Sequence, residues 1–338
     1  MANSANLKSN HRHLEYIRSS NLCVAGETPI LTKTGYHQIQ SLQDQNVEVW
    51  NGSEWSSVVV KQTAPRRHLI TVYFSNGRSL TCTPDHKFIV GDGPLKEVKR
   101  IPAQFLIPGM KLRQEEFPVV EGSGPFPHPY LHGALSAFGC FSDQGPIMDV
   151  MGPVLGSILS HPDMVTTEKG GKAFPDNMPA PYAVPINSSV FNKIQWLSGF
   201  LDARSFSGNQ GIALLNINET LLQNVQLLLT TLNVRSIVNK GDTVKVPLPD
   251  GKSVSVYNYG LMIPWDGIRK LRTLGLIGRY RDGDIPTLET TLDLLVSDIV
   301  DIGRLSPTYC FTEEKNNAGI FNGILTGQCL EVIEFIVR

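Results

Sequence analysis

The sequence has no excess charge of one sign and no long apolar run. Its 338 residues include 30 Lys and Arg against 31 Asp and Glu, so the formal net charge is −1. This balance excludes a whole-chain field that would hold nucleic acid or a membrane surface, and any contact with DNA has to be local. No stretch approaches the roughly 18 consecutive apolar residues of a membrane-spanning helix, and the first residues lack the apolar core of a secretory signal. We expect a cytoplasmic monomer without membrane contact.

Cysteine is also scarce, and its spacing excludes two common uses. No two of the five cysteines form a Cys-x-x-Cys pair, and an odd number spread along the chain fits neither a disulfide framework nor a zinc site. Each thiol therefore has to be interpreted from its neighbours. We expect Cys82 and Cys140 to be small core residues, because free cysteine often behaves as a buried hydrophobe.

Both ends of the chain have the pattern of β structure. Apolar runs flank Asn-Gly pairs at residues 51–52, 76–77 and 322–323. Asn-Gly between such runs is a strong hairpin signal, because both central residues of a type I′ turn need positive φ. Val296–Ile302 is predicted as a further strand.

The middle of the chain differs from both ends. Residues 118–130 are rich in glycine and proline and predict a linker. A helix is predicted from Asn218, a potential N-cap, to Asn233, with an apolar stripe of Leu221, Leu222, Val225, Leu228, Leu229 and Leu232. An α+β unit is thus inserted between two β halves. Neither half is long enough to bury much core alone, so we expect the halves to form one domain.

Three ordered motifs in the β halves resemble those of the self-splicing inteins. Cys23 opens the string CVAGETPILTKTGYHQIQSL, in which a nucleophile precedes a turn and a strand. The string LTCTPDHKFIV contains a Thr-x-x-His motif at Thr83 and His86. PTYCFTEEKNNAGIFNGILTGQC, ending at Cys329, is similar to the family's C-terminal motif. The resemblance implies an all-β Hint horseshoe interrupted by the α+β unit.

The flanking residues carry a second resemblance. Removal of Cys23–Gln328 would join the string SSNL to CLEVIEF. The product resembles the segment of ribonucleotide reductase large subunits that contains an active-site cysteine. The resemblance implies that these flanks are host sequences, or exteins, that act in cis, with Cys329 as the host's catalytic thiol.

The chemistry of splicing explains the residue types of the first two motifs. A thiol directly after the scissile carbonyl lets Cys23 attack Leu22 in an N-to-S acyl shift. The amide nitrogen leaves only if it is protonated, and a histidine that titrates near neutral pH suits that task. His86 is therefore the candidate acid, and Thr83 offers a hydroxyl or a backbone amide to the oxyanion. Cys329 then attacks the thioester, because thiolates are strong nucleophiles near neutral pH.

The C-terminal motif departs from the family. The last residue is usually Asn, but here Gln328 has to close a six-membered glutarimide, which freezes one more rotatable bond. The usual penultimate His is Gly327, and a more distant His is replaced by Asn317. Cys310 occupies a position at which many relatives carry Asp. It could pack, relay a proton, or form a disulfide with Cys23 that pauses splicing.

The inserted unit resembles a LAGLIDADG homing endonuclease. One motif is WLSGFLDARSF at 196–206, and an earlier copy is YLHGALSAFGCFSD at 130–143. In active members the eighth motif position is an acidic ligand of a divalent metal between two scissile phosphates. Here those positions are Phe138 and Arg204, while Asp202 remains at the sixth position. The resemblance implies a degenerate nuclease, unless the motif is shifted and Asp143 or Asp202 is the true ligand.

Three functions remain open. The first is autocatalytic splicing with an inactive nuclease, the second is an active Mg²⁺-dependent endonuclease, and the third is a reductase fragment with an inert insert. Splicing should need no cofactor, since every required group is in the chain. Residual binding of double-stranded DNA is expected through phosphate contacts from Arg235, Lys240, Lys245, Arg269, Arg272, Arg279 and Arg281. The predicted segments are an N-terminal flank at 1–22, splicing-domain halves at 23–117 and 293–328, the endonuclease at 118–292, and a C-terminal flank at 329–338.

Overall fold

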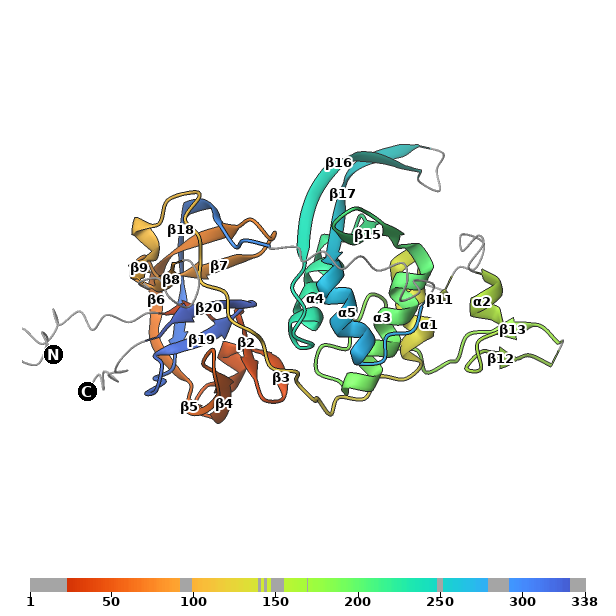
Figure 1. Ribbon diagram of the computed structural model, residues 1–338, viewed down its shortest axis with the longest axis horizontal. Coiled ribbons are helices and arrows are strands. Elements are labelled where there is room, and N and C mark those ends of the chain that lie inside the picture. The colour runs from red at the N-terminus through yellow and green to blue at the C-terminus, as the bar shows by residue number, and fades with distance from the viewer. Residues whose placement is uncertain are drawn as a thin grey trace, which may run out of the picture.

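A computed structural model describes residues 23–91, 99–138, 141–142, 145–146, 155–168, 170–247, 252–278 and 292–328. The chain forms two lobes (Figure 1). One lobe contains the strands from both ends of the chain, and the other contains the middle of the chain with its helices. Within the described residues, no helix has the length and apolar character needed to cross a membrane.

A closed barrel of four strands forms one half of the β lobe. Its strands are β1 (Val24–Ala25), β18 (Val296–Cys310), β6 (Lys61–Phe74) and β7 (Ser79–Cys82), in that order. The short strand β1 pairs with β18 on one side and with β7 on the other. This double pairing fixes the backbone that follows Cys23 between segments from the two halves of the sequence.

A second antiparallel sheet interleaves strands from both ends of the chain. Its order is β5 (Trp55–Val59), β4 (Asn46–Trp50), β2 (Pro29–Thr32), β19 (Ala318–Phe321), β20 (Ile324–Gly327), β8 (Lys87–Val90) and β9 (Lys99–Pro102), with β3 (Gly35–Gln38) paired to β2. Short 3₁₀ turns lie at Ile39–Leu42 and Ala103–Phe105. Because β19 and β20 lie between strands of the first half, the two halves form one folding unit, as the sequence predicts.

The Asn-Gly hairpins are all present, but only one has the predicted two-residue turn. Phe321 pairs with Ile324, and both Asn322 and Gly323 have positive φ, of 46° and 74°. At 51–52 the strands are joined by four residues. The backbone of Asn51 does not have a positive φ, and its side-chain oxygen accepts hydrogen bonds from the backbone N–H groups of Ser53 and Glu54. The turn at 76–77 is also longer, with Tyr73 paired to Ser79. The predicted strand at 296–302 is confirmed and continues to Cys310.

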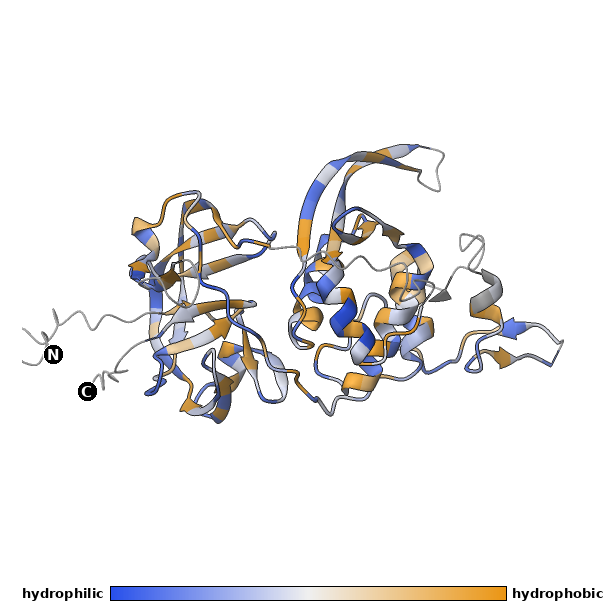
Figure 2. Ribbon diagram, in the orientation of Figure 1, coloured by the Kyte–Doolittle hydropathy of each residue, from blue (hydrophilic) through white to orange (hydrophobic). Residues whose placement is uncertain are grey.

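The second lobe combines helices with an antiparallel sheet. The sheet order is β14 (Phe206–Ser207), β15 (Gly211–Asn216), β17 (Ser253–Pro264) and β16 (Ile237–Pro247). The long helices are α1 (Pro129–Phe138), α3 (Val190–Arg204), α4 (Glu219–Thr230) and α5 (Trp265–Thr273). Figure 2 shows hydrophilic residues on α5, which is nevertheless buried at Trp265, Gly267, Ile268 and Leu271. Helix α1 is buried from Leu131 to Ala137. Smaller elements are α2 (Leu155–Leu159), β10 (Phe141–Ser142), β11 (Gly145–Pro146), β12 (Val165–Thr166) and β13 (Lys172–Ala173).

Helix α4 has the predicted N-cap and core face. The Asn218 side chain accepts a hydrogen bond of 2.9 Å from the Leu221 amide, which satisfies one of the free donors of the first turn. All six residues of the predicted stripe are buried. The helix ends at Thr230, three residues earlier than predicted.

The predicted linker packs along the second lobe. The Val120 amide donates to the Thr231 carbonyl, and the Val120 carbonyl accepts from the buried Lys193 ammonium at 2.7 Å. The Asn187 side chain binds both the backbone N–H and C=O of Tyr36 in β3, each at 2.8 Å. These contacts tie the two lobes together beyond their covalent connections.

Candidate functional site

Cys23 lies in a buried position where strands from the two halves of the sequence meet. Its side chain is 1% exposed, and the thiol is free. Cys23 Sγ is 2.9 Å from Thr63 Oγ1 in β6, and Thr63 donates onward to the Thr308 carbonyl in β18. The thiol is therefore held by one hydroxyl from β6, which is itself held by β18 from the other half of the sequence.

Thr83 holds both backbone polar groups of Cys23. The Cys23 amide donates to Thr83 Oγ1 at 3.3 Å, and the Thr83 amide donates to the Cys23 carbonyl at 2.9 Å. We predicted that Thr83 would serve the Leu22 carbonyl with its hydroxyl or its amide. The Thr83 amide binds the Cys23 carbonyl, and the Thr83 hydroxyl accepts from the nitrogen of the Leu22–Cys23 bond. Leu22 lies outside the described residues, so the contact with its carbonyl stays a prediction.

His86 connects this turn to the C-terminal hairpin. Its backbone N–H donates to the Thr83 carbonyl, and its ring is fully buried. His86 Nε2 is 2.9 Å from Thr326 Oγ1 in β20, and the ring has edge contacts with Phe88 and Phe321. Because a hydroxyl can donate or accept, Thr326 can pair with either tautomer of the ring, and the contact fixes the ring's orientation.

Gln328 is held at both its main chain and its side chain. Its side chain is 2% exposed, and its backbone N–H donates to the Asn317 carbonyl at 2.7 Å. The Cys310 thiol donates to Gln328 Oε1 at 3.1 Å. Gln328 Nε2 is buried and has no hydrogen-bond partner among the described residues. The side-chain amide oxygen of Gln328 is thus held, while its amide nitrogen has no partner among the described residues.

The predicted residues of the β lobe fall into two connected groups. Cys23, Thr83 and His86 form one group, and Cys310, Asn317 and Gln328 form the other. Asn317 contributes its backbone carbonyl, with a positive φ of 49°. The predicted nucleophile Cys329 lies outside the described residues.

Sequence analysis missed the hydroxyl residues Thr63, Thr308 and Thr326. Thr63 and Thr308 are brought to Cys23 only by long-range strand pairing. Thr326 left a weak signal, since in a strand its side chain points to the same face as that of Gln328, two residues later. The buried Cys82 confirms the prediction of a core residue, and burial raises the pKa of its thiol, with smaller contributions from Asp85 and Cys23. Cys140 lies outside the described residues.

In the second lobe, the helices that carry the two nuclease-like motifs pack against each other. A Cβ atom on Gly133 would lie 2.0 Å from the Trp196 carbonyl, and one on Gly199 would lie 2.0 Å from the Tyr130 carbonyl. Both glycines are therefore required for backbone contact between α1 and α3. The buried His132 ring accepts a hydrogen bond from the Trp196 indole at 3.0 Å across the same interface.

The motif positions of this interface form no acidic pair. Phe138 is half-buried, Arg204 is exposed, and Asp202 accepts a hydrogen bond from the Tyr130 hydroxyl at 3.1 Å. Burial and the nearby Asp202 raise the pKa of Tyr130 to about 12. No group of three His, Cys, Asp or Glu side chains in the described part of the chain could hold a metal ion. Asp143 lies outside that part.

The basic residues predicted to contact DNA have varied surroundings. Arg235 donates to the Glu115 carbonyl, and the Lys240 ammonium lies 3.4 Å from the centre of the Tyr257 ring. Lys245 is exposed on β16, whereas Arg269 and Arg272 on α5 are half-buried. Arg279 and Arg281 lie outside the described residues.

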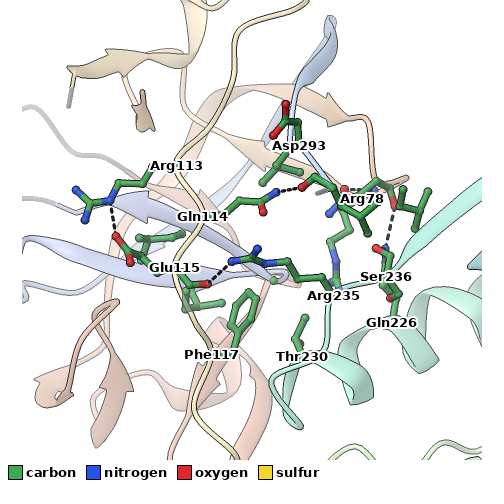
Figure 3. A pocket seen from close by; sticks show the side chains of 17 residues that line it. Arg78, Arg113, Gln114, Glu115, Phe117, Gln226, Thr230, Arg235, Ser236 and Asp293 are labelled. Carbon is green, nitrogen blue, oxygen red and sulfur yellow. Dashed lines mark hydrogen bonds and ion pairs between the residues drawn. The ribbon is translucent and has the colours of Figure 1, made fainter. Parts of the chain in front are cut away.

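A cavity of about 50 Å³ lies at the junction of the lobes, away from the two groups described above (Figure 3). Burial lowers the pKa of Arg78 to about 10, against an opposing effect of Tyr36. The guanidinium of Arg78 donates to the Asn322 carbonyl at 2.9 Å in the β19–β20 turn. Gln226 donates across the junction to the Asn76 carbonyl. The cavity walls thus connect α4 to the hairpin that precedes Gln328.

The chain is similar to large subunits of ribonucleotide reductase. It is 34% identical over 351 residues to the ribonucleoside-diphosphate reductase large subunit of Invertebrate iridescent virus 6, covering 94% of this chain and 36% of that protein. It is 24% identical over 421 residues to the ribonucleoside-diphosphate reductase NrdEB subunit alpha of Bacillus subtilis (strain 168), covering 98% and 38%. The chain thus spans little more than a third of the length of these relatives.

Solved structures of inteins also align with the chain. A DnaB intein from Synechocystis sp. PCC 6803 aligns over 90% of this chain and 97% of its own, at 9% identity and a TM-score of 0.33. The gp41-1 intein aligns over 26% and 65%, at 18% identity and a TM-score of 0.21. No family model matches the chain.

Proposed function

We propose that this chain is an autocatalytic splicing protein that excises Cys23–Gln328 and joins Leu22 to Cys329. One observation carries the proposal. The thiol and amide of Cys23, the imidazole of His86 and the side chain of Gln328 are all buried, and Thr326 connects the turn at His86 to the strand that ends beside Gln328. An inert insertion has no need for such an arrangement at its two ends.

The first step is an N-to-S acyl shift. The Cys23 thiol loses its proton, its sulfur bonds to the Leu22 carbonyl carbon, and the Leu22–Cys23 amide bond breaks as the nitrogen takes up a proton. The hydrogen bond from the Cys23 amide to Thr83 Oγ1 fixes the orientation of this nitrogen. His86 is the proposed proton donor, and burial of Cys23 keeps water from its thiol.

The second step transfers the upstream segment. The Cys329 thiolate attacks the thioester carbonyl, a new carbon–sulfur bond forms, and Cys23 leaves as a thiol. The chain is then branched at Cys329.

The third step releases the branched chain. Gln328 Nε2 bonds to the carbonyl carbon of Gln328 itself, the bond to the Cys329 nitrogen breaks, and the proton lost by Nε2 passes to that nitrogen. The Cys310 thiol, which donates to Gln328 Oε1, is a positioning group for this ring closure. An S-to-N shift then forms the Leu22–Cys329 peptide bond. No metal or cofactor is proposed for any of these steps.

We infer that the host protein is a ribonucleotide reductase large subunit. The sequence that joins residue 22 to Cys329 resembles its active-site segment, and the viral relative carries that name. The host flanks take part in cis, as the upstream acyl group and the downstream thiol.

Intact-mass spectrometry of freshly expressed, reduced protein tests the proposal. Splicing predicts two products, a ligated peptide of residues 1–22 with 329–338 and an excised chain of residues 23–328. Cys23→Ala should abolish ligation and thiol-induced cleavage, whereas Gln328→Ala should preserve thiol-induced cleavage after Leu22 and abolish release of 329–338. A wild-type chain that stays intact for days, with and without added thiol, would exclude splicing.

For the second lobe, we propose a degenerate LAGLIDADG endonuclease. The α1–α3 glycine contact is compatible with that architecture, while Phe138 and Arg204 provide no carboxylates for a metal. The alternative is an active endonuclease that cuts the uninterrupted reductase gene. Incubation of the protein with that DNA and Mg²⁺ separates the two, because cleavage that EDTA abolishes would establish the alternative, and binding without cleavage would support a degenerate enzyme.

A further inference from the structure

Arg100 on β9 reaches across to the loop before β19. Its Nη1 donates to the Asn317 carbonyl at 2.7 Å, and its Nη2 donates to the Asn316 carbonyl at 2.6 Å. A guanidinium is a planar fork, so two adjacent carbonyls fix its orientation as well as its position. The pairing of Ile89 with Arg100 in the β8–β9 ladder fixes the base of the side chain.

The Asn317 carbonyl is shared between Arg100 and Gln328. The same oxygen that accepts from Arg100 Nη1 accepts the backbone N–H of Gln328 at 2.7 Å. Asn317 has a left-handed φ of 49°, a conformation that asparagine tolerates better than most residues. Arg100 therefore stabilises the backbone conformation that directs this carbonyl at Gln328.

We propose that Arg100 is a positioning residue for the release of Cys329, acting through the Asn317 carbonyl on the main chain of Gln328. This inference rests on the splicing function proposed above. Ring closure brings Gln328 Nε2 to the carbonyl carbon of the same residue, so the Gln328 main chain has to stay fixed while the side chain turns. The Arg100–Asn317 pair holds the main chain, and Cys310 holds the side-chain oxygen.

A six-membered ring makes this restraint important. Closure of a glutarimide freezes several side-chain torsions, and each freely rotating bond lowers the population of reactive conformers. No histidine occupies position 317 or 327, where the sequence has Asn and Gly. The guanidinium of Arg100 lies beside Gly327 instead, and it carries its positive charge without having to take up a proton.

Gly327 leaves space for the guanidinium of Arg100. A Cβ atom at position 327 would lie 3.0 Å from Arg100 Nη1 and 3.3 Å from the Lys87 carbonyl. Any side chain there would displace the tip of Arg100 before it displaced the backbone. The absence of a side chain at the penultimate position thus makes room for the contact between Arg100 and Asn317.

A buried carboxylate supports the charge of Arg100. Glu313 is fully buried, and its carboxylate accepts from the Asn316 amide at 2.8 Å, so it orders the loop whose carbonyls Arg100 binds. Desolvation lowers the pKa of Arg100, and the negative charge of Glu313 raises it again. The charge of Glu313 thus opposes the loss of the Arg100 charge on burial.

The test measures the two ends of the full-length chain separately. Thiol-induced cleavage after Leu22 reports the first step, and release of residues 329–338 reports ring closure. We expect Arg100→Met to slow release about tenfold to a hundredfold and to leave thiol-induced cleavage within about twofold. Arg100→Lys should recover part of the rate, because an ammonium reaches one carbonyl but not both. Arg66→Met, which removes an exposed arginine from β6, is the matched control and should change neither rate.

A second variant distinguishes the loss of the Arg100 contact from misfolding of the protein. Gly327→Ala should slow release a few-fold in the wild type and have no further effect together with Arg100→Met, because both changes break one contact. Additive effects, or equal loss at both ends in Arg100→Met, would overturn the role of Arg100. An unchanged release rate in Arg100→Met would overturn this inference alone, whereas a wild-type chain that never releases residues 329–338 would overturn the proposed splicing.

Discussion

At the scale of single residues, Thr326 links His86 to the C-terminal hairpin by a hydrogen bond. Thr326→Val keeps the shape and removes the hydroxyl that is 2.9 Å from His86 Nε2. We expect thiol-induced cleavage after Leu22 to slow about tenfold, because the ring loses the hydrogen bond that fixes its orientation, and His86→Ala to slow it at least about a hundredfold. Cleavage rates at pH 7 provide the measurement.

Thr71→Val is the matched control for this prediction. It removes a cross-strand hydroxyl contact with Thr81, 3.0 Å long, between β6 and β7. Its rate should match that of the wild type. If Thr326→Val cleaves as fast as Thr71→Val, then Thr326 does not orient His86.

The sequence identifies candidate reactive residues more readily than the residues that contact them. Cys23, His86 and Gln328 are candidates by residue type and motif order, and the structure buries all three. Thr63 and Arg100 could not be predicted, since only long-range pairing brings β6 to Cys23 and β9 to Asn317. A short chain segment contains no information on which distant strand will lie beside it.

At the scale of elements, two glycines set the distance between α1 and α3. We expect Gly133→Ala to lower the free energy of unfolding of the second lobe by about 3 kcal/mol, because the new Cβ would meet the Trp196 carbonyl. Gly156→Ala in α2 is the control, since its Cβ would meet nothing within 4 Å and alanine favours helix. Urea unfolding in a Cys23→Ala, Gln328→Ala background measures both. Equal stability of the two variants would contradict the helix contact.

The buried Lys193 on α3 should make the stability of this lobe increase with pH in the alkaline range. Burial lowers its pKa from 10.5 to about 8, with an opposing effect of Glu121. Between these values the unfolded state binds the proton and the native state does not, so stability rises as pH increases from 8 to 10.5. The gain is on the order of 3 kcal/mol at most, at about 1.4 kcal/mol per pKa unit.

Two variants isolate the effect of Lys193. Lys193→Met should lose this rise in the free energy of unfolding, measured by urea titration at pH 7.5 and pH 10. Lys245→Met, at an exposed position on β16, should keep it. A parallel pH dependence in the wild type and Lys193→Met would show that Lys193 is not the group responsible.

The same elements show where local patterns are sufficient. The cap and stripe of α4 are local features, and the structure has both. Turn geometry is less local, because Asn51 satisfies its turn with its side chain, whereas Asn322 adopts positive φ. An Asn-Gly pair therefore predicts a reversal of the chain but not its length.

At the scale of the whole molecule, the lobes share an apolar cluster. It includes Leu31 and Tyr36 from the first half of the β lobe, Ile320 and Leu325 from the C-terminal hairpin, and Leu227 from α4. Each lobe also has its own larger core. We therefore expect the wild type to unfold in a single transition.

Asn187 is the residue through which this coupling can be tested. Its side-chain amide binds the N–H and C=O of Tyr36 as a neighbouring strand would, and removal leaves both buried groups unpaired. We expect Asn187→Ala to split thermal unfolding into two transitions, measured by calorimetry and by far-ultraviolet circular dichroism, which follows the helices of the second lobe. Asn239→Ala, at an exposed position on β16, should keep one transition. If Asn187→Ala lowers the transition temperature but keeps a single peak, the shared apolar cluster alone couples the two lobes. In that case, heating should abolish splicing activity at the same temperature at which the helices of the second lobe unfold.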